Sequence, residues 1–175
     1  RRLMREHRFH LKKVGNRGWR RLVPSPDPKK ILEGAVIERL LEGGAVVIAA
    51  GGGGVPLMEV AGTYQGIDAV IEKDLAAQQL AHQIDADLLL HLTDVQGVAL
   101  DFGKPQQRWL DRVTAPELRY YQQEGHFDPE SMGPKVESAV RFVSHGQPNR
   151  RAAIGSLSDV PRLLAGHAGT WVVPL

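Results

Sequence analysis

Two lysines and a run of glycines are the residues in this chain whose types and spacing could do chemistry. Four consecutive glycines at positions 51–54 follow the apolar run AVVIAA. Lys73 and Asp74 stand where one segment turns into a helical pattern, and Lys135 stands in the first turn of another. A lysine at a helix N-terminus opposes the macrodipole at a cost of ~0.3–1 kcal/mol, which a shared anion would offset. The pair favours an anion site, although either lysine by itself is better interpreted as an ordinary surface residue.

The glycine run does not match an established nucleotide motif. A P-loop requires Lys and Ser or Thr after its last glycine, but Val55 and Pro56 stand there. The G-x-G-x-x-G fingerprint fails from Gly51 and from Gly52, and the kinase glycine-rich loop lacks its following Val-Ala-Ile-Lys. What remains is a strand end with backbone N–H groups that can point at an anion. A tight structural turn is the alternative.

A third group of polar residues lies in the segment LLLHLTDVQGV. Thr93 and Asp94 follow an apolar strand and precede a turn at Gly97. Asp94 could orient a metal, a lysine or a ribose hydroxyl, or it could cap the turn through its own backbone. His91, inside the apolar strand, is interpreted as a core histidine whose hydrogen bonds are satisfied.

The elements that must position these residues alternate between helix and strand. Apolar residues recur at helical spacing and as short buried runs. Helices are predicted over residues 29–44, 73–84, 115–125 and 131–143 and near 159–166, with strands over 45–50, 87–93, 98–102, 151–156 and 169–173. Thr114 is the predicted cap of one helix, and Pro134 is the predicted first residue of another. This alternation predicts an α/β fold, an open αβα sandwich with a mostly parallel sheet, in which ligands bind at the carboxyl ends of the strands.

Composition and charge restrict the class of protein. The 175 residues are 42% hydrophobic and 24% charged, as in a globular domain, and they include no cysteine, which excludes disulfides and thiolate metal sites. No apolar stretch approaches the ~20 residues of a membrane helix, so a cytoplasmic protein without membrane contact is expected. Residues 1–30 hold 11 of the 22 Lys and Arg. This basic arm is interpreted as a solvated face or as a stretch separated from its partner, and no nucleic-acid partner is expected.

The segments AAGGGGVP, EKDLA and SMGPKVE together resemble the amino-acid kinase family, and within it the carbamate kinases. The resemblance continues through ADLLLHLTDVQGV, FGKPQQRWLDRVT, AAIGSLSDV and AGTWVVP, in collinear order from about Asn16 to the last residue. It implies a nucleotide-binding α/β lobe over residues 29–175, preceded by a basic connector over 1–28 that is a remnant of a lid subdomain. It also implies a homodimer.

What this resemblance implies chemically is reversible phosphoryl transfer, from ATP and carbamate to ADP and carbamoyl phosphate. Such enzymes often run towards ATP in arginine catabolism, with Mg²⁺ bound through the nucleotide and no metal held by the protein. Lys73 and Lys135 would bind the phosphates and the transferring group, and Asp74 would organise them. The resemblance places the carbamate end at Gly51, Gly52, Gly53 and Gly54, and the nucleotide at Thr93, Asp94, Gly97, Phe102 and Met132.

The sequence departs from the family pattern in two ways. Glu72 stands where carbamate kinases usually have Asp, which keeps the carboxylate with one more methylene. The Gly-Gly-Asn loop and the lid lysine of a KPIGP-type motif are not found, so an N-terminally incomplete fold is expected. Two interpretations follow: a fragment of an active carbamate kinase, or a catalytically weak remnant that acts as a nucleotide-binding or dimerisation module.

Overall fold

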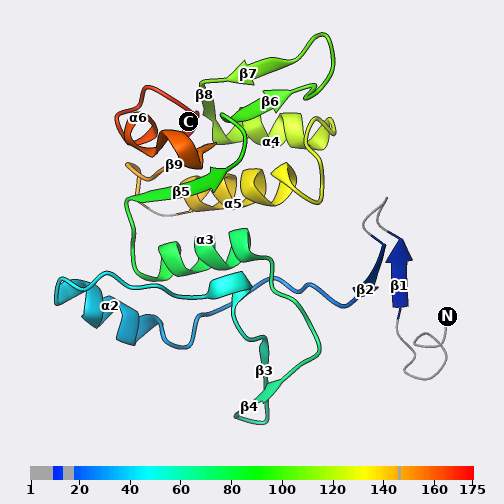
Figure 1. Ribbon diagram of the computed structural model, residues 1–175. Coiled ribbons are helices and arrows are strands. Elements are labelled where there is room, and N and C mark those ends of the chain that lie inside the picture. The colour runs from blue at the N-terminus through cyan, green and yellow to red at the C-terminus, as the bar shows by residue number, and fades with distance from the viewer. Residues whose placement is uncertain (1–9, 14–17, 146) are drawn as a thin grey trace.

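A four-stranded sheet forms the centre of the protein (Figure 1). The computed structural model describes residues 10–13, 18–145 and 147–175. Strand order is β5-β9-β10-β8, with β5 at Leu88–Thr93, β9 at Arg151–Ser156, β10 at Thr170–Val173 and β8 at Arg112–Thr114. The pairs β5–β9 and β10–β8 are parallel, and β9–β10 is antiparallel. The predicted α/β fold with a mostly parallel sheet is therefore confirmed.

Helices cover both faces of this sheet. On one face lie α3 (Lys73–Gln83), α4 (Ala115–Gln123) and α5 (Met132–Ser144), packed side by side over β5, β9 and β10. The short helix α6 (Val160–Leu164) packs on β9. It covers the other face. Ile154 points into the core, and its neighbour Gly155 must face the opposite side of the sheet, where an added Cβ on Gly155 would lie 2.9 Å from Leu163 of α6. These are the two helical layers of an αβα sandwich.

The core lies between the sheet and α5. Its fully buried side chains come from helices and strands together: Leu118, Val136, Val140, Phe142, Ile154 and Val172. The apolar face predicted for the helix at 131–143 is buried throughout, as its period of three to four residues requires. However, α5 begins at Met132, so Pro134 is its third residue and not its first. Proline is tolerated there because the N–H groups of a first helical turn have no intrahelical acceptor.

Smaller elements surround this body. Antiparallel hairpins are formed by β1 (His10–Lys13) with β2 (Trp19–Leu22), β3 (Leu57–Val60) with β4 (Thr63–Gly66), and β6 (Val98–Leu100) with β7 (Arg108–Leu110). Figure 1 shows the first hairpin standing apart from the sheet. Lys12 reaches Glu130, which precedes α5, at 3.0 Å, and Arg21 pairs with Asp68, which precedes α3. Among the residues that the structure describes, no helix is long and apolar enough to cross a membrane.

The predicted buried strand at residues 45–50 is not formed. The segment has no strand hydrogen bonds, and Val46 and Ile48 are 95% and 98% exposed. The preceding helix α2 (Gly34–Glu42) is shorter than the predicted range 29–44, and its apolar residues Val36 and Leu40 are also largely exposed. An apolar run becomes a strand only when a neighbouring backbone pairs with it, and no described segment does so. The periodicity identified an interior segment, but in this structure it lies at the surface.

Helix α4 begins with the cap predicted at Thr114. The backbone N–H of Glu117 donates to the Thr114 hydroxyl at 3.4 Å, and the Glu117 carboxylate accepts from the Thr114 backbone at 2.9 Å. This capping box satisfies N–H groups that have no partner within the helix.

We expect Thr114→Ala to lower the free energy of unfolding by about 1 kcal/mol, because the cap hydroxyl is lost. Thr114→Ser keeps that hydroxyl and should stay close to wild type. Urea denaturation followed by circular dichroism measures both variants. Equal stabilities of the alanine and serine variants would show that the hydroxyl contributes nothing.

Candidate functional site

The first turns of α3 and α5 bring the predicted lysines to one carboxylate. Lys73 is the first residue of α3, and Lys135 lies near the start of α5. The Lys135 ammonium lies 3.0 and 3.1 Å from the two carboxylate oxygens of Asp74. The Lys73 ammonium lies 3.4 Å from Asp74 and 3.0 Å from Glu72. The three residues predicted to be catalytic are therefore neighbours, although they come from helices far apart in the sequence.

Topology explains why these helix ends meet. The chain runs through α3 into β5, and through α5 into β9. Because β5 and β9 are parallel, the N-termini of both helices lie at the edge where these strands end. Thr93, the last residue of β5, lies at the same edge. This is the edge at which α/β sheets bind ligands.

The surroundings of Asp74 and Lys73 favour the charged form of each group. Burial would raise the pKa of Asp74, whose side chain is only 8% exposed, but contacts with His91 and Lys135 outweigh burial and hold it well below the ordinary value of 3.8. The hydrogen bond to Glu72, partly opposed by burial and supported by Asp74, raises the pKa of Lys73 above 10.5. One buried carboxylate thus holds two ammonium groups, of which Lys73 is the more exposed.

A buried histidine and a serine lie behind Asp74. His91 Nε2 lies 2.8 Å from the Ser138 hydroxyl, and His91 Nδ1 lies 3.3 Å from Asp74 Oδ1. The Ser138 hydroxyl also donates to the backbone carbonyl of Asp74 at 2.7 Å. The prediction that His91 is a satisfied core histidine is confirmed. The sequence analysis missed its partner, since the only signal was a polar residue within LLLHLT.

The glycine run forms a tight turn beside α3. The 3₁₀ element η2 (Gly51–Gly53) follows Ala50, which has φ 49°. A Cβ on Gly53 would lie 2.1 Å from the carbonyl oxygen of Ile71, two residues before Lys73. By contrast, Cβ positions on Gly51, Gly52 and Gly54 would meet no heavy atom within 4 Å. Gly53 is therefore required for close packing, whereas the other three leave open space around their backbone next to the site.

The residues predicted to bind the nucleotide differ in how near they lie to the lysine cluster. Met132 begins α5 and packs against the core on the same helix as Lys135. Phe102 is 59% exposed and stands edge-on to Trp109, with ring centroids 6.0 Å apart. Asp94 accepts a hydrogen bond from Thr93 at 3.1 Å, and no described contact joins it to the lysines. Gly97 is buried against Thr170. Of these residues, Met132 is the one that shares a helix with Lys135.

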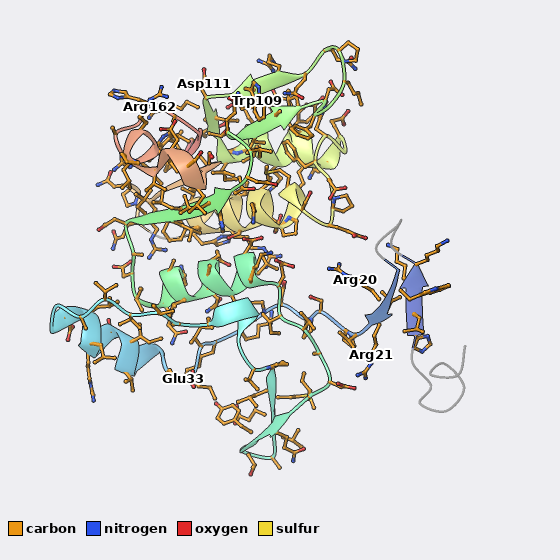
Figure 2. All side chains as sticks on the ribbon, viewed as in Figure 1. Arg20, Arg21, Glu33, Trp109, Asp111 and Arg162 are labelled. Atoms are coloured by element: carbon orange, nitrogen blue, oxygen red, sulfur yellow. The ribbon has the colours of Figure 1, made fainter. Side chains whose placement is uncertain are left out.

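A cleft of about 500 Å³ lies beside the end of β9, whose last residue Ser156 is part of its lining. It includes Gly97, Trp109, Asp111, Arg162 and Trp171 in its lining, but neither lysine. Figure 2 shows Trp109, Asp111 and Arg162 close to α6, far from Arg20 and Arg21 of β2. Within the described ranges, no group of three or more His, Asp or Glu side chains is arranged to hold a metal ion.

Comparison with known proteins identifies the class. The model of the amino acid kinase family matches residues 2–155. The chain therefore belongs to the amino-acid kinase family.

Within this family the chain is similar to carbamate kinases. It is 49% identical to the carbamate kinase of Thermococcus kodakarensis over 171 residues, which are 98% of this chain and 54% of that protein. It is 48% identical to that of Pyrococcus horikoshii, with the same coverage. The carbamate kinase of Giardia lamblia bound to AMP-PNP matches with a TM-score of 0.91 at 36% identity, over 99% of this chain and 55% of that one. The chain spans about half the length of these relatives.

We expect Gly53→Ala to destabilise the protein by about 2 kcal/mol or more, because alanine is strained at a φ of 104° and its Cβ would collide with Ile71. Gly51→Ala is the matched control. Its Cβ meets open space, so its stability should stay unchanged or rise by up to about 1 kcal/mol. Thermal and urea denaturation measure the difference, and equal effects would contradict the packing role of Gly53.

We expect Asp74→Asn to change how stability depends on pH. Because folding lowers the pKa of Asp74, its stabilising contribution is fully present above the ordinary value of 3.8 and is lost as the pH falls towards the lower folded value. In the asparagine variant this loss disappears, which reduces the acid-side slope by up to about 1.4 kcal/mol per pH unit. Urea denaturation from about pH 2 to about pH 6 measures both slopes. Parallel curves would show that Asp74 is not a depressed, ion-paired carboxylate.

Proposed function

We propose that this chain carries out the phosphoryl transfer of a carbamate kinase, between ATP with carbamate and ADP with carbamoyl phosphate. The observation that carries the proposal is the pair of ammonium groups fixed by the buried Asp74 at the ligand-binding edge of the sheet. The similarity to carbamate kinases over nearly the whole chain supports it. Because the chain spans about half the length of these relatives, the proposal includes the claim that this chain is active.

The arrangement suits a reaction that needs charge and alignment more than acid–base chemistry. In the ATP-forming direction, an oxygen of the ADP β-phosphate attacks the phosphorus of carbamoyl phosphate, the bond from phosphorus to the carbamoyl oxygen breaks, and carbamate leaves as an anion. No proton is transferred, so no general base is required. Lys73 and Lys135 would hold the two anions in line and stabilise the charge that spreads over the transferring group.

The remaining roles are proposed on the family resemblance and on position. Mg²⁺ would arrive with the nucleotide and neutralise phosphate charge. The nucleotide would lie along Thr93, Asp94, Gly97, Phe102 and Met132, and the carbamoyl group near the open backbone of Gly51, Gly52 and Gly54. The homodimer, the cytoplasmic location, the role in arginine catabolism and the division into segments 1–28 and 29–175 stay predictions.

A second candidate function is favoured by the uncovered apolar surface. Val46 and Ile48 are almost fully exposed, and the chain covers only about half the length of the relatives it matches. A module that binds nucleotide or dimerises through such a surface, without transferring a phosphoryl group, would also use the lysine cluster. The two functions differ in whether ADP binding is accompanied by ATP formation.

We expect Lys73→Ala and Lys135→Ala each to lower turnover by about 10²- to 10³-fold, because each removes a cation aligned with the transferring group. Lys104→Ala is the matched control, since Lys104 is an exposed lysine paired with Asp101 outside the cluster. ATP formation from ADP and carbamoyl phosphate is measured in a coupled assay, with circular dichroism as a check on folding.

The outcomes separate the two candidates. Wild-type turnover in either lysine variant would refute the assignment of that lysine. ADP binding by calorimetry without any carbamoyl phosphate-dependent ATP formation in the wild-type chain would select the binding module. Loss of ADP binding in both lysine variants, but not in Lys104→Ala, would place the phosphates at the cluster in either case.

A further inference from the structure

The orientation of the Asp74 carboxylate determines where both lysines point. Its Oδ2 atom lies within reach of both Lys73 and Lys135, while Oδ1 contacts Lys135 and the Nδ1 atom of His91. Lysine ammonium groups sit on flexible stems and do not fix a carboxylate by themselves. The imidazole of His91 is 4% exposed and held between β5, α3 and α5. It is the rigid member of the group.

The hydrogen-bond donors and acceptors of Asp74, Ser138 and His91 form one connected set of contacts. The backbone carbonyl of Asp74 can only accept, so the Ser138 hydroxyl donates its single proton there. The Ser138 oxygen then accepts from His91 Nε2 at 2.8 Å. Nδ1 faces the Asp74 carboxylate, which is also an acceptor. His91 Nε2 is therefore the donor in its contact with Ser138, while Nδ1 lies beside the carboxylate of the same aspartate whose backbone Ser138 binds.

These contacts hold Asp74 at two points. Ser138 binds its backbone carbonyl, and His91 approaches its carboxylate, so the residue is restrained along both its main chain and its side chain. The charged groups facing the ring are Asp74 from α3 and, through the shared carboxylate, Lys135 from α5 and Lys73. A network of this kind, fully buried and connected to a charged group, fixes geometry more firmly than a single pair does.

We propose that His91 and Ser138 are positioning residues that orient the Asp74 carboxylate, and through it the ammonium of Lys135, for phosphoryl transfer. The inference rests on the proposed function for its catalytic consequence, but not for its structural one. Neither residue touches the substrates. Their removal should misdirect Lys135 while leaving both lysines present.

We expect His91→Leu and Ser138→Ala to lower kcat by up to about 100-fold while the KM for ADP stays nearly constant, because alignment is lost and charge is kept. His91→Gln, which retains polar atoms, should recover part of the loss. Since both residues act through Asp74, the double variant His91→Leu/Ser138→Ala should lose less than the product of the single effects. Leu89→Val, on the same face of β5 and also buried, is the control for a purely structural effect.

A second readout does not depend on turnover. In ¹⁵N-edited NMR spectra, we expect the ammonium of Lys135, 13% exposed and ion-paired, to give a protected signal that disappears in Lys135→Ala. His91→Leu, His91→Gln and Ser138→Ala should shift or broaden this signal, and Leu89→Val should preserve it. A wild-type chain without transferase activity would refute the proposed function but not this inference. An unchanged or undetectable Lys135 signal in wild type and variants alike, or a kcat loss in Leu89→Val equal to that in His91→Leu, would overturn it.

Discussion

The site depends on one buried carboxylate that must remain charged. Asp74 is almost fully removed from solvent, and an unpaired buried charge would cost several kcal/mol. Its compensation comes from three directions: Lys135 on α5, Lys73 on its own helix and His91 on β5. The position near the N-terminus of α3 adds the favourable end of the helix dipole. Any movement of α3 relative to α5 or β5 would separate these groups, so the electrostatics tie the packing of three elements to the geometry of the site.

This constraint explains why the lysines stand at unfavourable helix positions. An ammonium at a helix N-terminus is repelled by the dipole, and two of them also repel each other. Asp74 offsets this repulsion in the absence of any ligand, since it contacts both. Lys135 is largely buried in this pairing, whereas Lys73 is 61% exposed and shared with Glu72. Glu72 therefore provides the exposed lysine with a second carboxylate at 3.0 Å.

Local patterns predicted what depends on local physics. The cap at Thr114 and the buried face of α5 follow from spacing within one helix, and both were correct. The prediction of a strand at residues 45–50 was wrong. A strand forms only by pairing with a neighbouring strand, and the spacing of apolar residues carries no information about that neighbour. Similarly, the lysines could be singled out by their helix positions, but His91 could not be connected to Ser138 or Asp74. The His91–Ser138 and Ser138–Asp74 contacts join residues 47 and 64 positions apart, and only the fold brings them together.

The uncovered apolar run and the charged cluster are structurally separable. Every contact that fixes Asp74 comes from α3, β5 or α5, which lie within the sandwich and share its core. None of these contacts involves residues 45–50. The link between the two regions is Gly53, which packs against the segment preceding Lys73. The cations can therefore be held in position by the sandwich alone, whereas the arrangement of the open glycine backbone beside them depends on how the preceding run is held. Under the proposed function, charge placement and acceptor placement would thus be carried by different parts of the chain, and phosphate binding would persist even where transfer to an acceptor requires the apolar run to be covered.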